Sequence, residues 1–131
     1  MQKKRGLHEA TLIDDSYNAN PESVRAALAV LAAAPGKKIL VLGDMGELGV
    51  NAVALHERIG EEARLAGVDR LLAVGELSAY TVAKFGAGAR HFEHIEELVA
   101  EVRTQLAADV TVLVKGSRFM QLERVVKDIE L

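Results

Sequence analysis

Short apolar runs alternate along this chain with stretches whose apolar residues recur at helical spacing. A polar opening arm at residues 2–5 turns at Gly6 and returns through an apolar stretch that ends in two acids. From there a strand pattern followed by a helix pattern occurs five times. The predicted strands lie at residues 11–13, 38–42, 70–75, 90–92 and 110–114; the predicted helices follow Pro21, span 52–66 and 78–85, begin near Ile95 and end the chain.

This order predicts an α/β domain, because strands that alternate with helices of about 10–15 residues form crossover units in a parallel sheet. The runs at 38–42 and 110–114 are apolar throughout, which is typical of strands buried on both faces. Right-handed crossovers then place helices on both faces. With the opening arm as an antiparallel edge strand, we expect three layers around a sheet of about six strands, five of them parallel.

Composition narrows the classes of protein to which the chain can belong. Half of its 131 residues are hydrophobic but only 4% are aromatic, so we expect one domain with an aliphatic core. A net charge of −3 disfavours a nucleic-acid surface, and the lack of cysteine excludes disulfides and thiolate metal sites. No apolar run is long enough to cross a bilayer and no signal sequence is recognisable, so we expect a cytoplasmic protein.

Three of the strand ends carry conspicuously polar segments, at residues 14–20, 43–49 and 115–118. In open α/β folds, ligands bind beyond the carboxyl ends of the strands, and these ends share one edge of the sheet. The strand ends after Val74 and Phe92 are poorer in polar groups. Turn chemistry alone does not account for three such loops on one edge, so we expect a ligand site there.

The loop at 14–20 offers carboxylate, phenol and amide groups. The dipole of the following helix stabilises a nearby acid, which accounts for one of Asp14 and Asp15 better than for both. Alternation along the strand sends the two side chains to opposite faces, so one of them is expected to face a ligand such as ribose. Tyr17 and Asn18 would add further polar groups, while Asn20 also fits a helix N-cap.

The loop at 43–49 has glycines at every third position, which partly matches a dinucleotide fingerprint. It lacks the G-x-G start that the tight turn needs, and Asp44 and Glu47 would repel a pyrophosphate. A rim loop is therefore a better interpretation than a phosphate cradle.

The loop at 115–118 places two cations and a hydroxyl between a buried strand and a helix. A solvated turn would explain Lys115, Ser117 and Arg118, but their position favours capture of a carboxylate or phosphate. Other chemistry lacks support: there is no G-x-x-x-x-G-K-[ST] phosphate loop and no G-x-S-x-G nucleophile motif. His91 and His94 lack a third metal ligand, so no metal site is expected.

Three motifs together resemble the C-terminal domain of the Mur ligases. They are Asp-Asp-Ser-Tyr-Asn-Ala-Asn-Pro at 14–21, Leu-Gly-Asp-Met-x-Glu-Leu-Gly at 42–49 and Val-Lys-Gly-Ser-Arg at 114–118, in order along nearly the whole chain. The resemblance implies a Rossmann-like domain, here residues 1–131, that follows a UDP-sugar domain and a central ATPase domain in a larger enzyme. We therefore expect the chain to be one third of a three-domain protein.

The Tyr-Asn-Ala-Asn-Pro sequence resembles the family branch that joins D-alanyl-D-alanine to UDP-N-acetylmuramoyl-tripeptide in peptidoglycan precursor synthesis. The family implies a bacterial cytoplasmic enzyme that uses ATP and Mg²⁺ and forms an acyl phosphate. The phosphate-binding loop and the Mg²⁺ ligands belong to its central domain, which this chain lacks. We accordingly expect the chain alone to have neither ligase nor ATPase activity.

The resemblance also implies roles for individual residues, although no catalytic residue is expected within the chain. Asp15 is the candidate ribose contact, with Tyr17 and Asn18 near the nucleotide. The candidates for binding the dipeptide are Asn18, Asn20, Lys115, Ser117 and Arg118. Lys115 and Arg118 both fit its terminal carboxylate, and the sequence does not decide between them.

Two other interpretations stay open at this point. A free-standing nucleotide-binding or regulatory module would use the Asp15 loop without chemistry of its own, and it would hold nucleotide tightly when isolated. A dinucleotide-dependent oxidoreductase domain is disfavoured by the glycine spacing at 43–49. A Gly-Lys-Thr loop upstream of residue 1 in the natural protein would favour the ligase.

Overall fold

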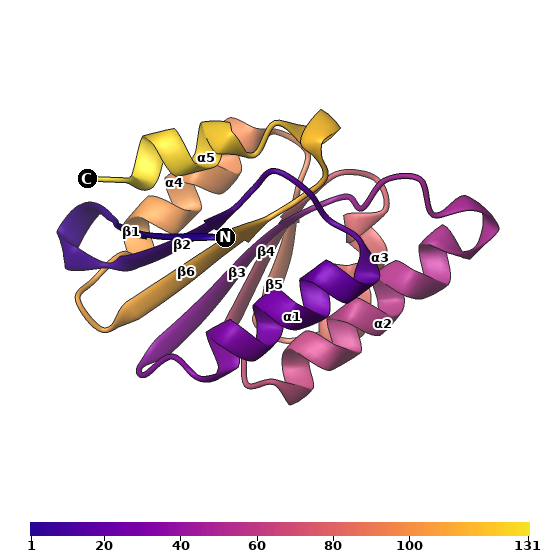
Figure 1. The fold of residues 1–131 in the computed structure, drawn as a ribbon, viewed down its shortest axis with the longest axis horizontal. Coiled ribbons are helices and arrows are strands. Elements are labelled where there is room, and N and C mark those ends of the chain that lie inside the picture. The colour runs from indigo at the N-terminus through magenta and orange to yellow at the C-terminus, as the bar shows by residue number, and fades with distance from the viewer.

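Six strands form one mixed sheet at the centre of the molecule (Figure 1), in a computed structural model that describes residues 1–131. The strands are β1 (Gln2–Arg5), β2 (Thr11–Asp15), β3 (Lys37–Gly43), β4 (Arg70–Val74), β5 (Ala89–Phe92) and β6 (Val110–Lys115). Their order across the sheet is β1-β2-β6-β3-β4-β5, with β1 antiparallel to β2 and every other pair parallel. The predicted α/β fold and its antiparallel edge strand are confirmed.

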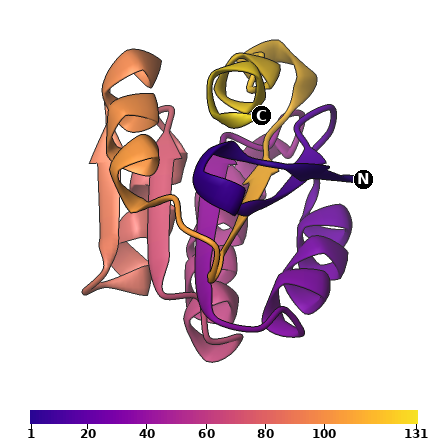
Figure 2. The same ribbon diagram turned by 90° about the vertical axis from the view of Figure 1, so that its left-hand side faces the viewer.

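Five α-helices cover the two faces of the sheet. They are α1 (Pro21–Ala32), α2 (Ala52–Leu65), α3 (Ser78–Phe85), α4 (Ile95–Gln105) and α5 (Glu123–Ile129). Figure 2 shows the sheet between α4 and α5 on one face and α1, α2 and α3 on the other. Strand alternation divides the core accordingly: in β6, Val112 and Val114 pack towards α4 and α5, and Leu113 packs towards α1 and α2. None of these helices is both long and apolar enough to cross a membrane.

Helix α1 begins where the sequence predicts. Asn20 Oδ1 accepts the N–H of Ser23 at 2.8 Å, and the Ser23 hydroxyl accepts the N–H of Asn20 at 3.0 Å, which together form a capping box. Pro21 occupies the first helical position, where it needs no N–H partner. The buried face consists of Val24, Ala27, Leu28 and Leu31. The cap fixes the far end of the loop that leaves β2.

Strands β2 and β6 extend into segments that the sequence pattern assigns to the polar loops. Strand β2 continues past Ile13 through Asp14 and Asp15, because these residues pair with Val114 and Lys115 of β6. Polar residues that the pattern places in loops therefore belong to the strands, since their backbones complete the ladder between β2 and β6. This extension decides which of the predicted site residues are buried.

The three polar strand ends are direct neighbours, since β6 lies between β2 and β3. Strands β2 and β3 lead into α1 and α2 on one face, whereas β6 leads into α5 on the other face. Adjacent strands whose connections leave in opposite directions open a crevice at the sheet edge. Strands β4 and β5, whose ends are poorer in polar groups, lie to one side of it.

Candidate functional site

The hydroxyl of Ser117 joins the three polar strand ends to one another. It accepts the N–H of Gly46 at 2.6 Å and donates to the carbonyl of Ala19 at 3.3 Å. The N–H of Ser117 donates to the carbonyl of Asp44 at 3.1 Å. The side chain is buried, so these contacts are shielded from water. Ser117 thus fixes the relative positions of the loops after β2, β3 and β6.

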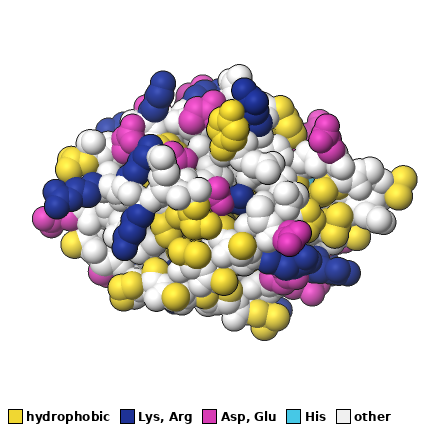
Figure 3. Space-filling view, viewed as in Figure 1, with side chains coloured by type: hydrophobic (Ala, Val, Ile, Leu, Met, Phe, Trp, Pro, Cys, Tyr) yellow, Lys and Arg dark blue, Asp and Glu magenta, His cyan; other side chains and the backbone are white.

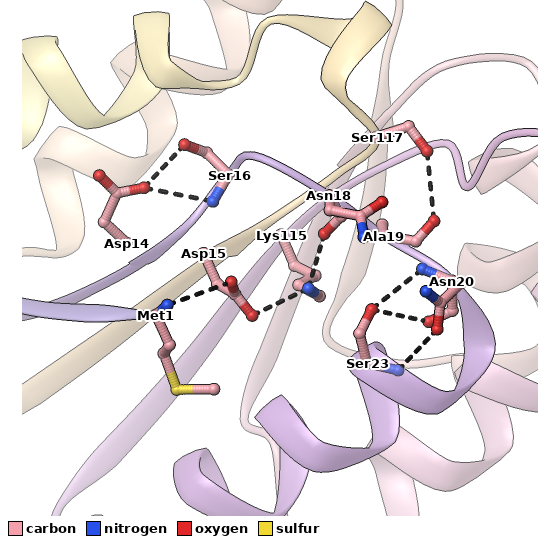
Figure 4. A network of polar contacts seen from close by, with 10 residues as sticks. All are labelled: Met1, Asp14, Asp15, Ser16, Asn18, Ala19, Asn20, Ser23, Lys115 and Ser117. Atoms are coloured by element: carbon pink, nitrogen blue, oxygen red, sulfur yellow. Dashed lines mark hydrogen bonds and ion pairs between the residues drawn. The ribbon is translucent and has the colours of Figure 1, made fainter.

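The side chain of Lys115 makes a second connection between β6 and the loop after β2. Figure 4 shows its ammonium group between Asp15 and Asn18: Nζ lies 2.8 Å from Asp15 Oδ2 and donates to the Asn18 carbonyl at 2.6 Å. Lys115 is 1% exposed. A lysine is this deeply buried only when its charge is paired, and here the ion pair and the carbonyl meet that need.

The neighbouring acid, Asp14, is held by different partners. Its Oδ1 accepts the hydroxyl of Ser16 at 2.7 Å and the N–H of Ser16 at 3.2 Å, and Oδ2 lies 3.1 Å from Nζ of Lys4. Burial raises the pKa of Asp14, but the bonds from Ser16 and Lys4 outweigh burial and hold that pKa below its ordinary value. The bond to Asp14 likewise raises the pKa of Lys4.

The loop after β3 is fixed from two sides. The buried Asp44 carboxylate accepts the N–H groups of Leu77 at 3.2 Å and Ser78 at 2.8 Å, and the Ser78 hydroxyl at 2.8 Å. On the other side, His56 Nε2 accepts the N–H of Met45 at 3.0 Å, and Nδ1 lies 2.7 Å from the carbonyl of Ala52. These partners require a neutral imidazole with its proton on Nδ1.

His56 is a residue whose structural importance the sequence does not reveal. It is fully buried on α2, on the same face as Ile59 and Ala63. Its contact with Met45 joins residues 11 positions apart across a turn, which no periodicity signals. Asp44 fixes this loop, whereas Glu47 is exposed at its rim.

Two hollows open at this edge of the sheet. The larger, which we call the Asn18 hollow, has a volume of about 650 Å³ and is lined by Asn18, Ala19, Asn20, Gly46, Glu47, Leu48, Ser117, Arg118 and Phe119. The second, the Asp15 hollow, has a volume of about 510 Å³ and is lined by Met1, Gln2, Asp14, Asp15, Ser16, Tyr17 and Glu123. Arg118 stands at the rim, with its guanidinium carbon 5.0 Å from the centre of the Tyr17 ring.

The structure brings together most of the residues that the sequence proposes for the dipeptide. Asn18, Asn20, Ser117 and Arg118 line the Asn18 hollow, but Lys115 lies buried between the two hollows and lines neither. Of the residues proposed for the nucleotide, Asp15 and Tyr17 line the Asp15 hollow while Asn18 lies in the other. The predicted residues therefore lie along one edge of the sheet and are divided between two neighbouring hollows.

The polar side chains at this edge can bind one part of an ATP–Mg²⁺ complex but not the rest of it. Asp15 Oδ2 is paired with Lys115 at 2.8 Å, whereas Oδ1 has only the Met1 amino group 3.7 Å away, beyond hydrogen-bond distance. Oδ1 can therefore still accept ribose hydroxyls. The chain has no glycine-rich phosphate loop, and no group of three or more His, Asp or Glu side chains is placed to hold a metal ion. The edge therefore fits the sugar end of a nucleotide and does not fit its phosphates with Mg²⁺.

Comparison with known protein families decides the affiliation of the chain. Residues 1–118 match the family model described as "Mur ligase, glutamate ligase domain". The chain belongs to the Mur ligase family. The three polar strand ends lie within the matched residues, whereas Phe119 and Glu123, which complete the linings of the two hollows, lie beyond them.

Curated relatives within the Mur ligase family share a name. The UDP-N-acetylmuramoyl-tripeptide–D-alanyl-D-alanine ligase of Escherichia coli is 44% identical over 121 residues, covering 91% of this chain and 26% of the relative. The ligase of that name from Haemophilus influenzae is 38% identical over 125 residues, covering 91% of this chain and 27% of the relative. The chain thus spans about a quarter of the length of these curated relatives.

Solved Mur ligase structures share the fold. MurF ligase from Thermotoga maritima, in complex with ADP, has a TM-score of 0.86 at 25% identity, covering 97% of this chain and 29% of that one. MurF from Acinetobacter baumannii has a TM-score of 0.87 at 30% identity, covering 97% of this chain and 28% of that one. The Rossmann-like architecture expected from the motifs is confirmed.

Proposed function

We propose that the chain is the C-terminal domain of an ATP-dependent ligase that joins D-alanyl-D-alanine to UDP-N-acetylmuramoyl-tripeptide in the bacterial cytoplasm. The observation that carries the proposal is the convergence of Asn18, Asn20 and Arg118 on one hollow, beside a second hollow that contains Asp15. The ligase name borne by relatives that are 44% and 38% identical supports it. The UDP-sugar domain and the central ATPase domain, as partners in the same protein, are part of this proposal.

On the nucleotide side, Asp15 would accept hydrogen bonds from the ribose hydroxyls of ATP. Tyr17, which is 68% exposed, and Asn18 would lie beside the nucleotide. The ADP in the Thermotoga maritima MurF structure supports nucleotide use by a relative of the same fold. The ATP phosphates and Mg²⁺ would be held by the central ATPase domain, so this chain would supply one side of a site that two domains share.

On the acceptor side, the Asn18 hollow offers the groups that a short dipeptide needs. Asn20 Oδ1 is used by the helix cap, which leaves Nδ2 free to donate. Arg118 supplies a cation, and Ala19, Leu48 and Phe119 supply apolar surface for methyl groups. Ser117 would act mainly by holding the loops that form the walls.

In the proposed reaction, the tripeptide carboxylate takes the γ-phosphoryl group of ATP, which gives an acyl phosphate and ADP. The dipeptide amine attacks the acyl carbon, loses a proton and expels inorganic phosphate, which leaves the amide. The residues of this chain would hold the dipeptide so that its amine faces the acyl carbon. Such positioning converts a bimolecular encounter into an effectively unimolecular attack.

Replacing Asp15 tests the nucleotide role in the complete ligase. The Asp15→Ala variant should raise the KM for ATP by about tenfold or more, the size expected when hydrogen bonds to a charged acceptor are lost. Glu61→Ala is the control, because Glu61 is an exposed acid on α2 that lines neither hollow, and its KM for ATP should change less than about twofold. Unchanged ATP kinetics in Asp15→Ala would contradict the role.

The 131-residue chain alone tests whether catalysis needs the proposed central domain. A coupled phosphate-release assay with all substrates should show no turnover, and calorimetric titration with ATP should show only weak binding. Turnover above background would contradict the proposal. Tight nucleotide binding by the chain alone would instead favour a free-standing nucleotide-binding or regulatory module.

A further inference from the structure

The two cations near the end of β6, Lys115 and Arg118, differ in how many partners they already have within the chain. Lys115 is 1% exposed, and its ammonium group is shared between Asp15 Oδ2 at 2.8 Å and the Asn18 carbonyl at 2.6 Å. A substrate carboxylate would have to displace one of these partners to reach Nζ. That exchange would leave Asp15 or the Asn18 carbonyl without its partner, which is costly at a site shielded from water.

Arg118 is in the opposite situation. Its side chain is exposed at the rim of the Asn18 hollow, and it forms no ion pair with any acid of the chain. Its one notable contact is with the face of the Tyr17 ring, at 5.0 Å from the ring centre, which orients the guanidinium and leaves its N–H groups free. A guanidinium with free N–H groups can bind a carboxylate through two parallel hydrogen bonds.

We propose that Arg118 anchors the terminal carboxylate of the dipeptide, and that Lys115 is a positioning residue that holds Asp15 and the Asn18 carbonyl without touching that carboxylate. This assignment rests on the proposed function and separates two residues that the sequence treats alike. Lys115 would act on both compartments at once, because Asp15 lines one hollow and Asn18 lines the other.

Matched methionine variants of the complete ligase test the assignment. For each enzyme, kcat/KM is measured with D-alanyl-D-alanine and with its C-terminal amide, which lacks the carboxylate charge. The unmodified ligase should prefer the acid by about tenfold to a hundredfold, the range for a charge-assisted hydrogen bond. Arg118→Met should abolish most of this preference, because the acid loses its partner while the amide loses little.

Lys115→Met should behave differently in the same assay. It should lower kcat/KM for the acid and the amide by similar factors, keep the preference for the acid and raise the KM for ATP through the displaced Asp15. Loss of the acid preference in Lys115→Met, or its survival in Arg118→Met, would overturn the assignment. If the unmodified ligase forms no amide bond with the dipeptide, the proposed function itself fails, and this assignment fails with it.

Lysine labelling of the unmodified ligase provides a test that does not depend on a folded variant. Reductive methylation followed by mass spectrometry should modify the exposed Lys3 and Lys127 readily and Lys115 very slowly. D-alanyl-D-alanine should leave the labelling of Lys115 unchanged. Rapid labelling of Lys115 that the dipeptide suppresses would show that its ammonium group meets the substrate, and would overturn the assignment.

Discussion

The Asn18 hollow, at the carboxyl ends of the parallel strands, differs in its lining from a hollow at their amino ends. At the carboxyl ends, the Asn18 hollow of about 650 Å³ lies over loops that Lys115 and Ser117 hold together. At the amino ends, a hollow of about 530 Å³ lies between β1, β2 and the end of α1. We call it the α1 hollow; it is lined by Met1, Lys3, Thr11, Ile13, Val30, Ala33, Ala34, Pro35, Gly36, Ala108, Asp109 and Thr111.

The α1 hollow and the Asn18 hollow have similar volumes, but the side chains that line them differ in chemistry. None of the side chains that line the α1 hollow makes a hydrogen bond within the chain, and Figure 3 shows hydrophobic side chains gathered over α1. At the carboxyl edge, by contrast, polar groups from three adjacent strands converge and are held by bonds between residues 97 and 98 positions apart. Polar groups fixed by such distant contacts, and not volume, distinguish the candidate site.

The largest change in stability at the carboxyl edge is expected from replacing His56, which holds the loop after β3 in place. His56→Leu should lower the free energy of unfolding by about 1–3 kcal/mol, because the buried N–H of Met45 loses its acceptor. His56→Gln can place an amide oxygen near the position of Nε2 and should keep most of the stability. Thermal unfolding, together with hydrogen exchange at the Met45 amide, measures both effects.

A shorter side chain serves as the control for the His56 variants. His56→Asn can still donate to the Ala52 carbonyl but cannot reach Met45, so its stability should fall between those of the Gln and Leu variants. Equal stability of all three variants would mean that the loop is held without this bond, and the two edges would then differ less than the contacts indicate.

A smaller effect, confined to acid, is expected from Asp14. Its pKa is lower in the folded chain than in the unfolded chain, so it stabilises the fold above about pH 4 and loses that contribution as the pH falls further. Asp14→Asn should therefore flatten the fall in melting temperature below about pH 4. Identical acid profiles of the two proteins would show that the bonds from Ser16 and Lys4 persist in the unfolded chain or contribute nothing.

The smallest effect is expected at the α1 hollow. Val30→Asp places a charge on its apolar wall, at an exposed helix position, and should change the free energy of unfolding by no more than about 0.5 kcal/mol. The kinetic constants of the complete ligase should stay within about twofold. Ala26→Asp, exposed on the same helix but outside the hollow, is the matched control. A rise in any KM with Val30→Asp alone would show that the α1 hollow takes part in function.

The sequence predicts the architecture because each helix and strand is specified by residues that are close together in the chain. The apolar runs of β3 and β6, the Asn20 cap and the polar strand ends are all visible in short windows of sequence. Burial at the site is not, because it depends on which strands become neighbours. Lys115 and Arg118 look equivalent in the sequence, yet pairing with β2 draws the first into the sheet and leaves the second at the rim.

The roles of the predicted site residues remain predictions, but their grouping is a property of the fold. Asn18, Asn20, Ser117 and Arg118 meet in one hollow because β6 inserts between β2 and β3. The sequence supplies the three polar segments, and the strand order supplies their adjacency. The bond from His56 to the loop after β3 has no counterpart in any sequence pattern.

The position of β6 also bears on the order in which the protein is built. It comes last among the six strands in chain order, and it alone joins the pair β1-β2 to the trio β3-β4-β5 within the sheet. A nascent chain that stops before residue 110 would hold two separate fragments of sheet, and its polar loops would have no fixed relation to one another. Closing such distant contacts is slow in folding. The polar edge would therefore form only after β6 has been synthesised, so joining the two parts of the sheet and bringing the three polar loops together would be one event.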